Sequence, residues 1–428
     1  MTTKLVIRFV TVVAAILSGI AAAPAAQAMA RTVQPGADDL RAVIVAARPG
    51  DRLLLAPGIH HGPIILDRSI TLLGQDGATI KGNGTGSTIR ITAPKVTVRG
   101  LTITNSGHSL ETMDAGIFIE KTGTGALVED NRLSGNLFGV YLFGSTDAIV
   151  RGNRIVGRTD LRVNERGNGV SLWNAPGAQV IDNSISHGRD GIFVNTSKRN
   201  RFVGNTFRNV RIAVHYMYAN NSEVSNNLSV GNHVGFALMY SRGLTVRGNI
   251  SRNDRDHGIL LNFTNSSTIS QNWVDRGSGK CVFIYNSSKN DFNANRFEGC
   301  PIGVHFTAGS ERNNIVANAF INNRTQVKYV GSRVLDWSRK GRGNYWSDNP
   351  TFDLDGNGIA DATYRPNDLV DHVVWRHRRA KLLLNSPAMQ ILRFAQSRFP
   401  ALLPGGVMDS APLMTPPPEM PTWKRVRP

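Results

Sequence analysis

Asparagine recurs along this chain with an almost constant spacing. Successive members of the series lie 22 or 23 residues apart, apart from one longer step of 30 residues. The series consists of Asn131, Asn153, Asn183, Asn205, Asn227, Asn249, Asn272, Asn295 and Asn318. A fixed period of this length indicates that one supersecondary unit is copied along the chain, so any acceptable fold must be a repeat architecture.

A short apolar run lies between successive asparagines and begins after a small residue. This residue is glycine in most repeats and is replaced by Ala213 and Cys281 in two of them. The first and third residues after it are apolar in every repeat, as Val304 and Phe306 are after Gly303, whereas the second and fourth vary. Alternation with a period of two predicts strands that bury one face in a core.

Each repeat holds only two or three such strands, too few to form a buried sheet alone. If the chain coils at about 22 residues per turn, like strands stack in parallel about 4.8 Å apart and each coil buries its apolar face against the next. Asparagines at one corner then form a side-chain ladder that satisfies the turn amides. We therefore predict an all-β, right-handed parallel β-helix with regular repeats over residues 111–343. A leucine-rich repeat fits poorly, because no helical segment separates the runs.

The ends of this solenoid have their own signals. Residues 29–110 supply the first coils and a short amphipathic helix at 37–47, which we expect to cap the open edge. The long step after Asn153 contains an insertion at 158–166, which we expect to protrude as a loop. Cys281 and Cys300 fall on neighbouring coils, where they could form a disulfide, stay as buried thiols or bind a metal.

The first 28 residues are typical of a secretory signal peptide. Lys4 and Arg8 precede an apolar stretch, and small residues at 26–28 suit a cleavage site. The net charge of +18 favours an anionic polysaccharide, an anionic lipid surface or an acidic protein patch as a partner, and export argues against nucleic acid.

The region at 344–414 differs from the repeats. Ser386 and Pro387 predict a helix start, and apolar residues at helical spacing follow it. Another helix is predicted at 369–384. The apolar face of the later helix either packs over the last coil or docks on a membrane protein. The Pro-rich basic segment 415–428 is expected to be disordered.

The run RPNDLVDHVVW…KLLLNSPAMQILRFAQSRFP…GGVMDSAPLM, placed after a β-helix of this type, resembles the NosD family. The resemblance implies a non-enzymatic periplasmic protein, held at the outer face of the inner membrane, that delivers or assembles the copper-sulfide site of nitrous oxide reductase. It further implies three partners: an ABC-type membrane subunit with its cytoplasmic ATPase, a copper chaperone lipoprotein and the apo-reductase.

A candidate copper site follows from the repeat arithmetic. The second and fourth positions after the small residue point outward, and they hold His215 and Met217 in one repeat and Ala237 and Met239 in the next. Stacking places the two thioethers about 4.8 Å apart, with His215 about 7 Å from Met217 along the strand. Cu(I) prefers thioether and imidazole donors. We predict a copper site at His215, Met217 and Met239, with an apolar partner interface as the alternative.

A second candidate site is a calcium loop. Asp353, Asp355 and Asn357 occupy loop positions 1, 3 and 5, and Asp361 occupies position 9. Position 12 is Tyr364 rather than the bidentate glutamate of an EF-hand. A ligand-free turn rich in Asx residues is the alternative.

The main alternative function is a polysaccharide-active β-helix enzyme, such as a uronan epimerase or lyase. The basic charge of the chain would suit an acidic polymer. The segment 254–257 superficially resembles the Asp-Pro-His-Asp signature of alginate epimerases. The order differs and the proline is missing. Glu120 is the only acid on the outward positions of the apolar runs, so a pair of catalytic carboxylates is not evident there.

Overall fold

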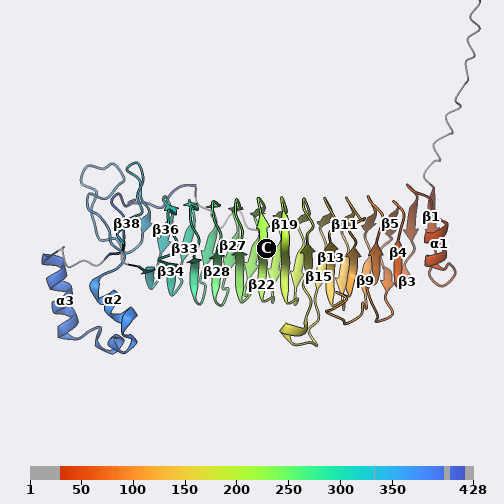
Figure 1. Cartoon of the computed structure of the whole chain (residues 1–428), viewed down its shortest axis with the longest axis horizontal. Coiled ribbons are helices and arrows are strands. Elements are labelled where there is room, and N and C mark those ends of the chain that lie inside the picture. The colour runs from red at the N-terminus through yellow and green to blue at the C-terminus, as the bar shows by residue number, and fades with distance from the viewer. Residues whose placement is uncertain (1–28, 332, 400–404, 420–428) are drawn as a thin grey trace, which may run out of the picture.

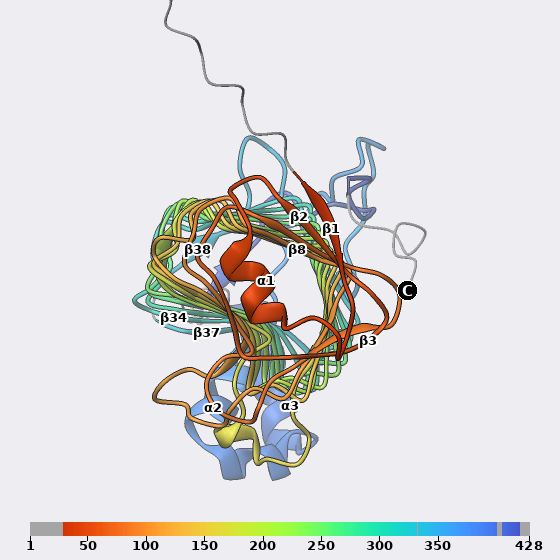
Figure 2. The same ribbon diagram turned by 90° about the vertical axis from the view of Figure 1, so that its right-hand side faces the viewer.

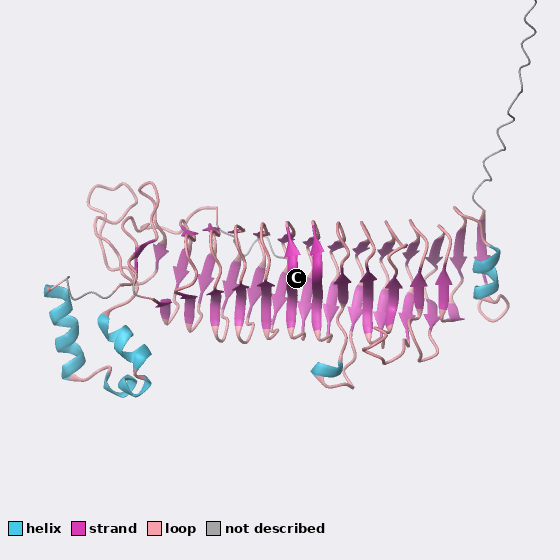
Figure 3. Ribbon diagram, in the orientation of Figure 1, coloured by secondary structure: helices cyan, strands magenta, loops and turns pink. Residues whose placement is uncertain are grey.

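The computed structural model describes residues 29–331, 333–399 and 405–419. In it the chain winds into a long solenoid in which each coil contributes one strand to each of three sheets (Figure 1 and Figure 3). The end-on view shows the coils superimposed around a single core (Figure 2). The predicted parallel β-helix is confirmed. The predicted signal peptide, 1–28, lies outside the described residues.

The three sheets run the length of the solenoid, and neighbouring strands within each are parallel. Sheet A contains β1 Ala30–Val33, β2 Arg52–Leu55, β5 Thr71–Gly74, β8 Thr97–Arg99, β11 Leu127–Glu129, β14 Ile149–Arg151, β17 Gln179–Ile181, β20 Arg201–Val203, β23 Glu223–Ser225, β26 Thr245–Arg247, β29 Thr268–Ser270, β32 Asp291–Asn293 and β35 Asn314–Ile315. Sheet B contains β3 Gly58–His61, β6 Ala78–Lys81, β9 Thr102–Thr104, β12 Arg132–Ser134, β15 Arg154–Val156, β18 Ser184–Ser186, β21 Thr206–Arg208, β24 Leu228–Val230, β27 Ile250–Arg252, β30 Trp273–Asp275, β33 Arg296–Glu298, β36 Ala319–Ile321 and β39 Tyr345–Trp346. Sheet C contains β4 Ile64–Leu66, β7 Ile89–Ile91, β10 Ala115–Ile119, β13 Phe138–Phe143, β16 Val170–Trp173, β19 Asp190–Lys198, β22 Ile212–Asn220, β25 Val234–Met239, β28 His257–Asn262, β31 Lys280–Tyr285, β34 Ile302–Thr307 and β37 Thr325–Val330.

The apolar runs of the sequence form sheet C. Its inward residues are almost fully excluded from solvent, and like positions stack on one another from coil to coil, as Ile117 does on Val140. The strict alternation therefore has the predicted cause, a single core running along the axis.

The asparagine series forms a continuous ladder between sheets A and B. Asn295 is typical: its Oδ1 accepts from the backbone N–H of Asn272 at 3.0 Å and from the Asn272 side-chain amide at 3.0 Å. Its own Nδ2 donates to the Ile269 carbonyl at 2.8 Å and to the next rung, Asn318, at 2.8 Å. Each rung is buried, so these bonds satisfy turn groups that water cannot reach.

The N-terminal end is closed by α1, Leu40–Ala46. Asp39 caps this helix by accepting from the Arg41 backbone N–H, and Leu40, Val43 and Ile44 face the core. Arg41 Nη2 donates to the carbonyl of Gly62 beside β4, which holds the helix over the first coil. The predicted helical cap is confirmed, somewhat shorter than residues 37–47.

The C-terminal end is closed by a returning segment. The ladder extends one rung beyond the predicted boundary, because Asn318 N–H donates to Asn344 Oδ1 at 3.0 Å. Asp409 then caps the ladder, because its Oδ2 accepts from the backbone N–H of Asn344 at 2.7 Å and from Trp346 Nε1 at 2.8 Å. Asp409 follows β40, Val407–Met408, which pairs with β38, Leu335–Asp336. The segment 415–428, expected to be disordered, is described only over 415–419, and 420–428 lies outside the described residues.

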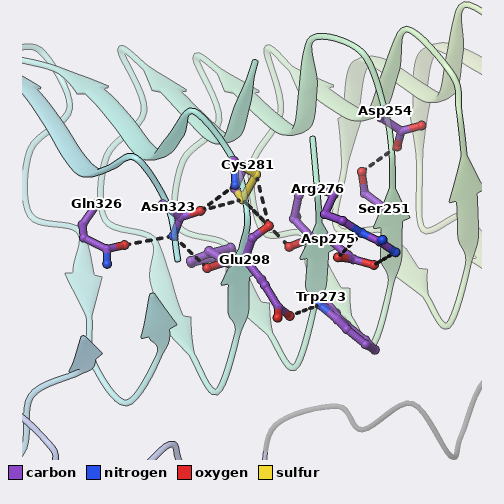
Figure 4. The surroundings of a disulfide bond; sticks show 12 residues. Ser251, Asp254, Trp273, Asp275, Arg276, Cys281, Glu298, Asn323 and Gln326 are labelled. Carbon is purple, nitrogen blue, oxygen red and sulfur yellow. Dashed lines mark hydrogen bonds and ion pairs between the residues drawn. A yellow bond between two sulfur atoms is a disulfide. The ribbon is translucent and has the colours of Figure 1, made fainter. Parts of the chain in front are cut away.

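Cys281 and Cys300 form a disulfide, with their Cα atoms 5.7 Å apart (Figure 4). Both residues are buried, Cys281 on β31 and Cys300 in the turn before β34. Of the three possibilities that the sequence left open, the structure therefore selects the disulfide.

Two protrusions leave the solenoid on the same flank (Figure 1 and Figure 2). One is the insertion at 158–166, which carries the short 3-10 helix η1, Val163–Glu165. The other is a helical hairpin made of α2, Leu369–Arg376, η2, Arg378–Leu383, and α3, Pro387–Arg398. A partner that contacts one protrusion therefore lies on the same side of the solenoid as the other protrusion.

The ladder makes a first prediction. Replacing Asn295 by alanine leaves buried donors and acceptors in two adjacent coils without partners, each of which costs about 1–3 kcal/mol. We expect Asn295→Ala to lower the free energy of unfolding by more than about 2 kcal/mol, measured by urea denaturation. Asn293→Ala is the matched control, because Asn293 is an exposed residue of β32 two positions away, and it should change stability by less than about 0.5 kcal/mol. Equal effects of the two substitutions would contradict the role of the ladder.

Asp254 is a carboxyl group buried in a second corner of the coil. Its side chain accepts from the hydroxyls of Ser229 and Ser251, at 2.7 and 2.5 Å, and from the Asn232 N–H at 2.8 Å. Burial raises the pKa of Asp254 from 3.8 to about 6, and the hydrogen bonds offset only part of this effect.

The raised pKa of Asp254 predicts a pH-dependent stability. The folded state favours the protonated carboxyl, so its stabilisation is complete below about pH 4 and is lost as the pH rises through about 6. The difference amounts to about 3 kcal/mol. Unfolding free energies of the wild type and of Asp254→Asn, measured from pH 4 to pH 8, should diverge over this window in favour of the variant. A constant difference at every pH would show that Asp254 does not titrate in this range.

Candidate functional site

The predicted copper donors lie together on the outward face of sheet C. Met217 of β22 and Met239 of β25 are direct cross-strand partners, and His215 lies two positions before Met217 on the same strand. All three side chains are partly exposed, whereas their neighbours Val214, Tyr216 and Leu238 fill the core. The two thioethers thus occupy adjacent coils at the same position, as the spacing predicts.

His215 is held by a buried carboxylate that the sequence analysis did not identify. Its Nδ1 lies 2.9 Å from Asp190 Oδ2, and Arg211 binds both oxygens of the same carboxylate at 2.8 and 2.6 Å. Burial alone would raise the pKa of Asp190, but the hydrogen bonds from His215 and Arg211 outweigh it and hold that pKa below its usual value. The ionised Asp190 fixes Nδ1 as the donor, which turns Nε2 into the nitrogen available to a ligand.

Exposed aromatic rings border the methionines. Tyr218, Tyr240 and Phe263 are 51, 38 and 40 % exposed, and they stack in succession with ring centroids 5.1 and 5.2 Å apart. All three have positive φ angles, a conformation that bulky side chains rarely adopt. The equivalent corner residues of the neighbouring coils, Thr196 and Asn286, share this conformation, so it belongs to the corner of the coil. Tyr216 does not belong to this surface, because the strand alternation directs it into the core, where it is fully buried.

The acidic loop at 353–361 closes on its own amides. Asp353 Oδ1 accepts from the Gly356 N–H at 2.8 Å, and its Oδ2 accepts from the Gly358 N–H at 2.7 Å. Asp361 Oδ2 accepts from the Leu354 N–H at 2.7 Å, and Asn357 bonds to Asp355. This is the arrangement of a turn rich in Asx residues, and within the described ranges no three His, Cys, Asp or Glu residues are placed to hold a metal ion. The geometry of this loop does not support a calcium site. Methionine is not among these four residue types, so the finding does not bear on the candidate copper site at Met217 and Met239.

The segment that resembled an epimerase signature does not form a surface site. Asp254 is buried and engaged by two serines, and Asp256 is partly exposed beside the buried His257. Glu120 is ion-paired with Arg90. These acidic groups therefore do not converge on one cleft.

One pair of acids on sheet B escaped the sequence analysis, which considered only the apolar runs of sheet C. Asp275 of β30 and Glu298 of β33 are cross-strand partners on the outward face. Arg252 contacts Asp275 at 2.9 Å and Arg296 contacts Glu298 at 2.7 Å, so each carboxylate is already neutralised by an arginine.

The C-terminal hairpin has its own small core. Val370 and Val374 of α2 pack on Met389 of α3, with Leu392 beside them. Elsewhere on α3, Ile391, Phe394 and Phe399 are 67, 63 and 64 % exposed, and the Arg398 guanidinium lies over the Phe394 ring. We call these three residues the α3 apolar face. The sequence left open whether the apolar side of this helix covers the last coil, and the structure shows that most of it does not.

The fold and these surfaces define a class of protein: an elongated β-helix that exposes thioether, imidazole and large apolar side chains, as a binding protein does. None of the helices in the described part of the chain is long and apolar enough to cross a membrane.

Comparison with known proteins identifies the family. Residues 152–350 match the family described as "Periplasmic copper-binding protein (NosD)". A "Probable ABC transporter binding protein NosD" of Stutzerimonas stutzeri is 39 % identical over 86 % of this chain and 88 % of its own length. A protein of the same name from Pseudomonas aeruginosa is 41 % identical over 85 % of this chain and 88 % of its own. The chain belongs to the NosD family, as its C-terminal motif predicted.

Solved structures confirm the fold alone. A family 28 exopolygalacturonase of Yersinia enterocolitica is similar with a TM-score of 0.57, covering 70 % of this chain and 76 % of its own, at 12 % sequence identity. The relatives that share the sequence are named as binding proteins, and this agrees with the prediction that the chain is not an enzyme.

Proposed function

We propose that this protein is a periplasmic scaffold that holds Cu(I) as its cargo at His215, Met217 and Met239. The observation that carries the proposal is the register of Met217 with Met239, beside an imidazole oriented by Asp190. Two thioethers and one imidazole form a donor set that suits Cu(I) and discriminates against hard cations. A carboxylate that orients a ligating histidine is the usual support of such a site.

The α3 apolar face is the docking surface for the membrane partner in this proposal. Three large exposed apolar side chains on one helix are costly in water and are typical of protein interfaces. The partner is an ABC-type membrane subunit, whose cytoplasmic ATPase supplies the energy and which holds the scaffold at the outer face of the inner membrane. The names of the relatives support this assignment.

The stacked aromatic rings beside the methionines form the contact surface for the proteins that exchange copper. Tyr218, Tyr240 and Phe263 form a row of rigid apolar rings at the corner of the coil that follows Met217 and Met239, which provides contact at low cost in conformational entropy. A copper chaperone lipoprotein delivers the ion in this scheme, and the apo form of nitrous oxide reductase receives it for its copper-sulfide site. The description of the family as periplasmic and copper-binding supports copper as the cargo that these partners would exchange.

The copper assignment predicts a loss of affinity on removal of the donors. The variant His215→Ala/Met217→Ala/Met239→Ala should bind Cu(I) roughly a hundredfold or more weakly than the wild type, because no donor of the set remains. Asp190→Asn should bind about tenfold more weakly, because the imidazole loses its orienting group. Competition with a chromogenic Cu(I) chelator under reducing conditions measures both affinities.

The matched control for copper binding is His61→Ala/Met113→Ala/Met414→Ala, which also removes one imidazole and two thioethers, from sites away from sheet C coils β22 and β25. Its Cu(I) affinity should equal that of the wild type. An unchanged affinity of the donor-free variant would remove the proposed site.

The docking assignment predicts that polar substitutions on α3 weaken the complex. Ile391→Ser/Phe394→Ser removes two exposed anchors, and we expect its affinity for the ABC-type membrane subunit in detergent to fall about tenfold or more. Thermal unfolding should be unchanged, because neither residue packs in a core.

Ile59→Ser/Phe352→Ser is the control for docking, since these residues are 50 and 74 % exposed and lie outside α3. A similar loss of affinity for both double variants would show that the effect is not specific to the α3 apolar face.

A further inference from the structure

Two arginines are direct cross-strand partners on the outward face of sheet B. Arg132 of β12 pairs with Arg154 of β15, and both side chains are exposed. The residues that alternate with them, Leu133 and Ile155, fill the core. Like charges directly opposite each other in a sheet are destabilising. The fold alone therefore gives no reason for placing these two arginines in register.

The chain neutralises comparable arginines elsewhere on the solenoid, but it does not neutralise this pair. On sheet A, for example, Arg201 donates to its cross-strand partner Glu223 at 2.9 Å. Among the residues that the structure describes, the guanidinium groups of Arg132 and Arg154 have no hydrogen bond or ion pair with the protein. Both groups are therefore available to an anion from outside the chain.

The surroundings of the pair offer hydroxyl groups instead of acids. No strand of sheet B that precedes β30 contains an aspartate or a glutamate. Asp130, in the turn before β12, is already ion-paired with Arg99 at 3.3 Å. In the row of outward residues that contains the two arginines, Thr102 comes directly before them and Ser184 directly after them. The two positive charges thus lie between neutral donors.

A pocket of about 440 Å³ lies at the arginine pair. Both guanidinium-bearing residues line it, together with Thr102, Ser134 and Val156. This volume falls within the range of about 300–1,000 Å³ that small-molecule sites occupy. The hydroxyls of Thr102 and Ser134 have no partner among the described residues, so each can donate to a ligand. The pocket therefore combines two planar sets of charged donors with two free hydroxyls.

This set of donors fits a phosphate monoester better than a carboxylate. One guanidinium group binds two oxygens of either anion through parallel hydrogen bonds. A carboxylate has only two oxygens, so the second guanidinium group would gain little from it. A phosphate monoester offers three oxygens and carries a charge of about −1.5 to −2 at pH 7. Two guanidinium groups match that charge, and the hydroxyls can serve the remaining oxygen.

We propose that Arg132 and Arg154 form an anion site for a phosphate monoester or for inorganic phosphate, with Thr102 and Ser134 as further donors. Binding neutralises two charges that otherwise repel each other across the strands. The same chemistry is offered by a free phosphate compound and by the headgroup of phosphatidic acid. The insertion at 158–166 leaves the solenoid just after β15, so the bound phosphate lies at the base of this protrusion (Figure 1).

The site is tested by calorimetric titration of the full-length protein with inorganic phosphate, in chloride buffer of constant ionic strength. Arg132→Gln/Arg154→Gln should bind phosphate about tenfold or more weakly than the wild type, because both charged donors are lost. Arg132→Lys/Arg154→Lys keeps the charge but loses the planar donors, so its affinity should lie between the two. A wild-type affinity in either double variant would overturn the proposal.

Two controls separate this site from a general effect of charge. Arg199→Gln/Arg242→Gln removes two exposed arginines from the corner between sheets C and A, and this variant should bind phosphate as the wild type does. Acetate at the same ionic strength should bind to the wild type about tenfold or more weakly than phosphate. Loss of phosphate binding in the control variant, or equal affinities for the two anions, would contradict the assignment.

Cosedimentation with lipid vesicles distinguishes the two sources of phosphate. Vesicles of phosphatidic acid in phosphatidylcholine carry a monoester, and vesicles of phosphatidylglycerol in phosphatidylcholine are the matched anionic control. Binding of the wild type to the first but not the second, lost in Arg132→Gln/Arg154→Gln, would assign a lipid headgroup. Binding of inorganic phosphate without binding to either vesicle would assign a free phosphate compound. If the wild type binds neither phosphate nor the phosphatidic acid vesicles, the proposal is wrong.

Discussion

The asparagine ladder is the interaction on which the rest of the structure depends. Each rung bonds to the turn before it and to the rung after it, so the coils cannot shift relative to one another without breaking buried bonds in two places. Because strand side chains alternate with a period of two, a slip of one residue would turn every inward residue outward. The ladder therefore fixes not only the stability of the stack but also which side chains reach solvent on sheet C.

Much of the fold was predictable because its determinants are local and repeated. The spacing of the asparagines gives the length of one coil, and the alternation in the apolar runs gives the direction of each side chain. Together they correctly predict that Met217 lies beside Met239. The role of Asp190 was not predicted, because it depends on contacts with Arg211 and His215 on the next coil, and the repeat spacing does not indicate such contacts. Asp409 was missed for a related reason: it caps Asn344 from 65 residues away, through a chain segment with no repeat.

The extensions differ from the solenoid in how far local patterns describe them. Ser386 and Pro387 correctly marked the start of α3, but helical spacing alone could not say which side of the helix would be covered. The acidic loop shows the same limit, since the spacing of its carboxylates is shared by calcium loops and by turns that bind their own amides. In both cases the outcome depends on tertiary contacts, which a local sequence pattern does not specify.

Sheet C also has a mechanical consequence. From β22, which carries Met217, to β37, where the hairpin joins the solenoid through Asn367 and the Val327 carbonyl, there are five parallel steps, or about 24 Å. A closed stack of hydrogen-bonded coils does not shorten or bend sharply over that span, so the distance between its two ends stays constant. Met217 and Met239 are therefore kept at a fixed distance from the helical hairpin, and a protein that contacts both regions must span that distance.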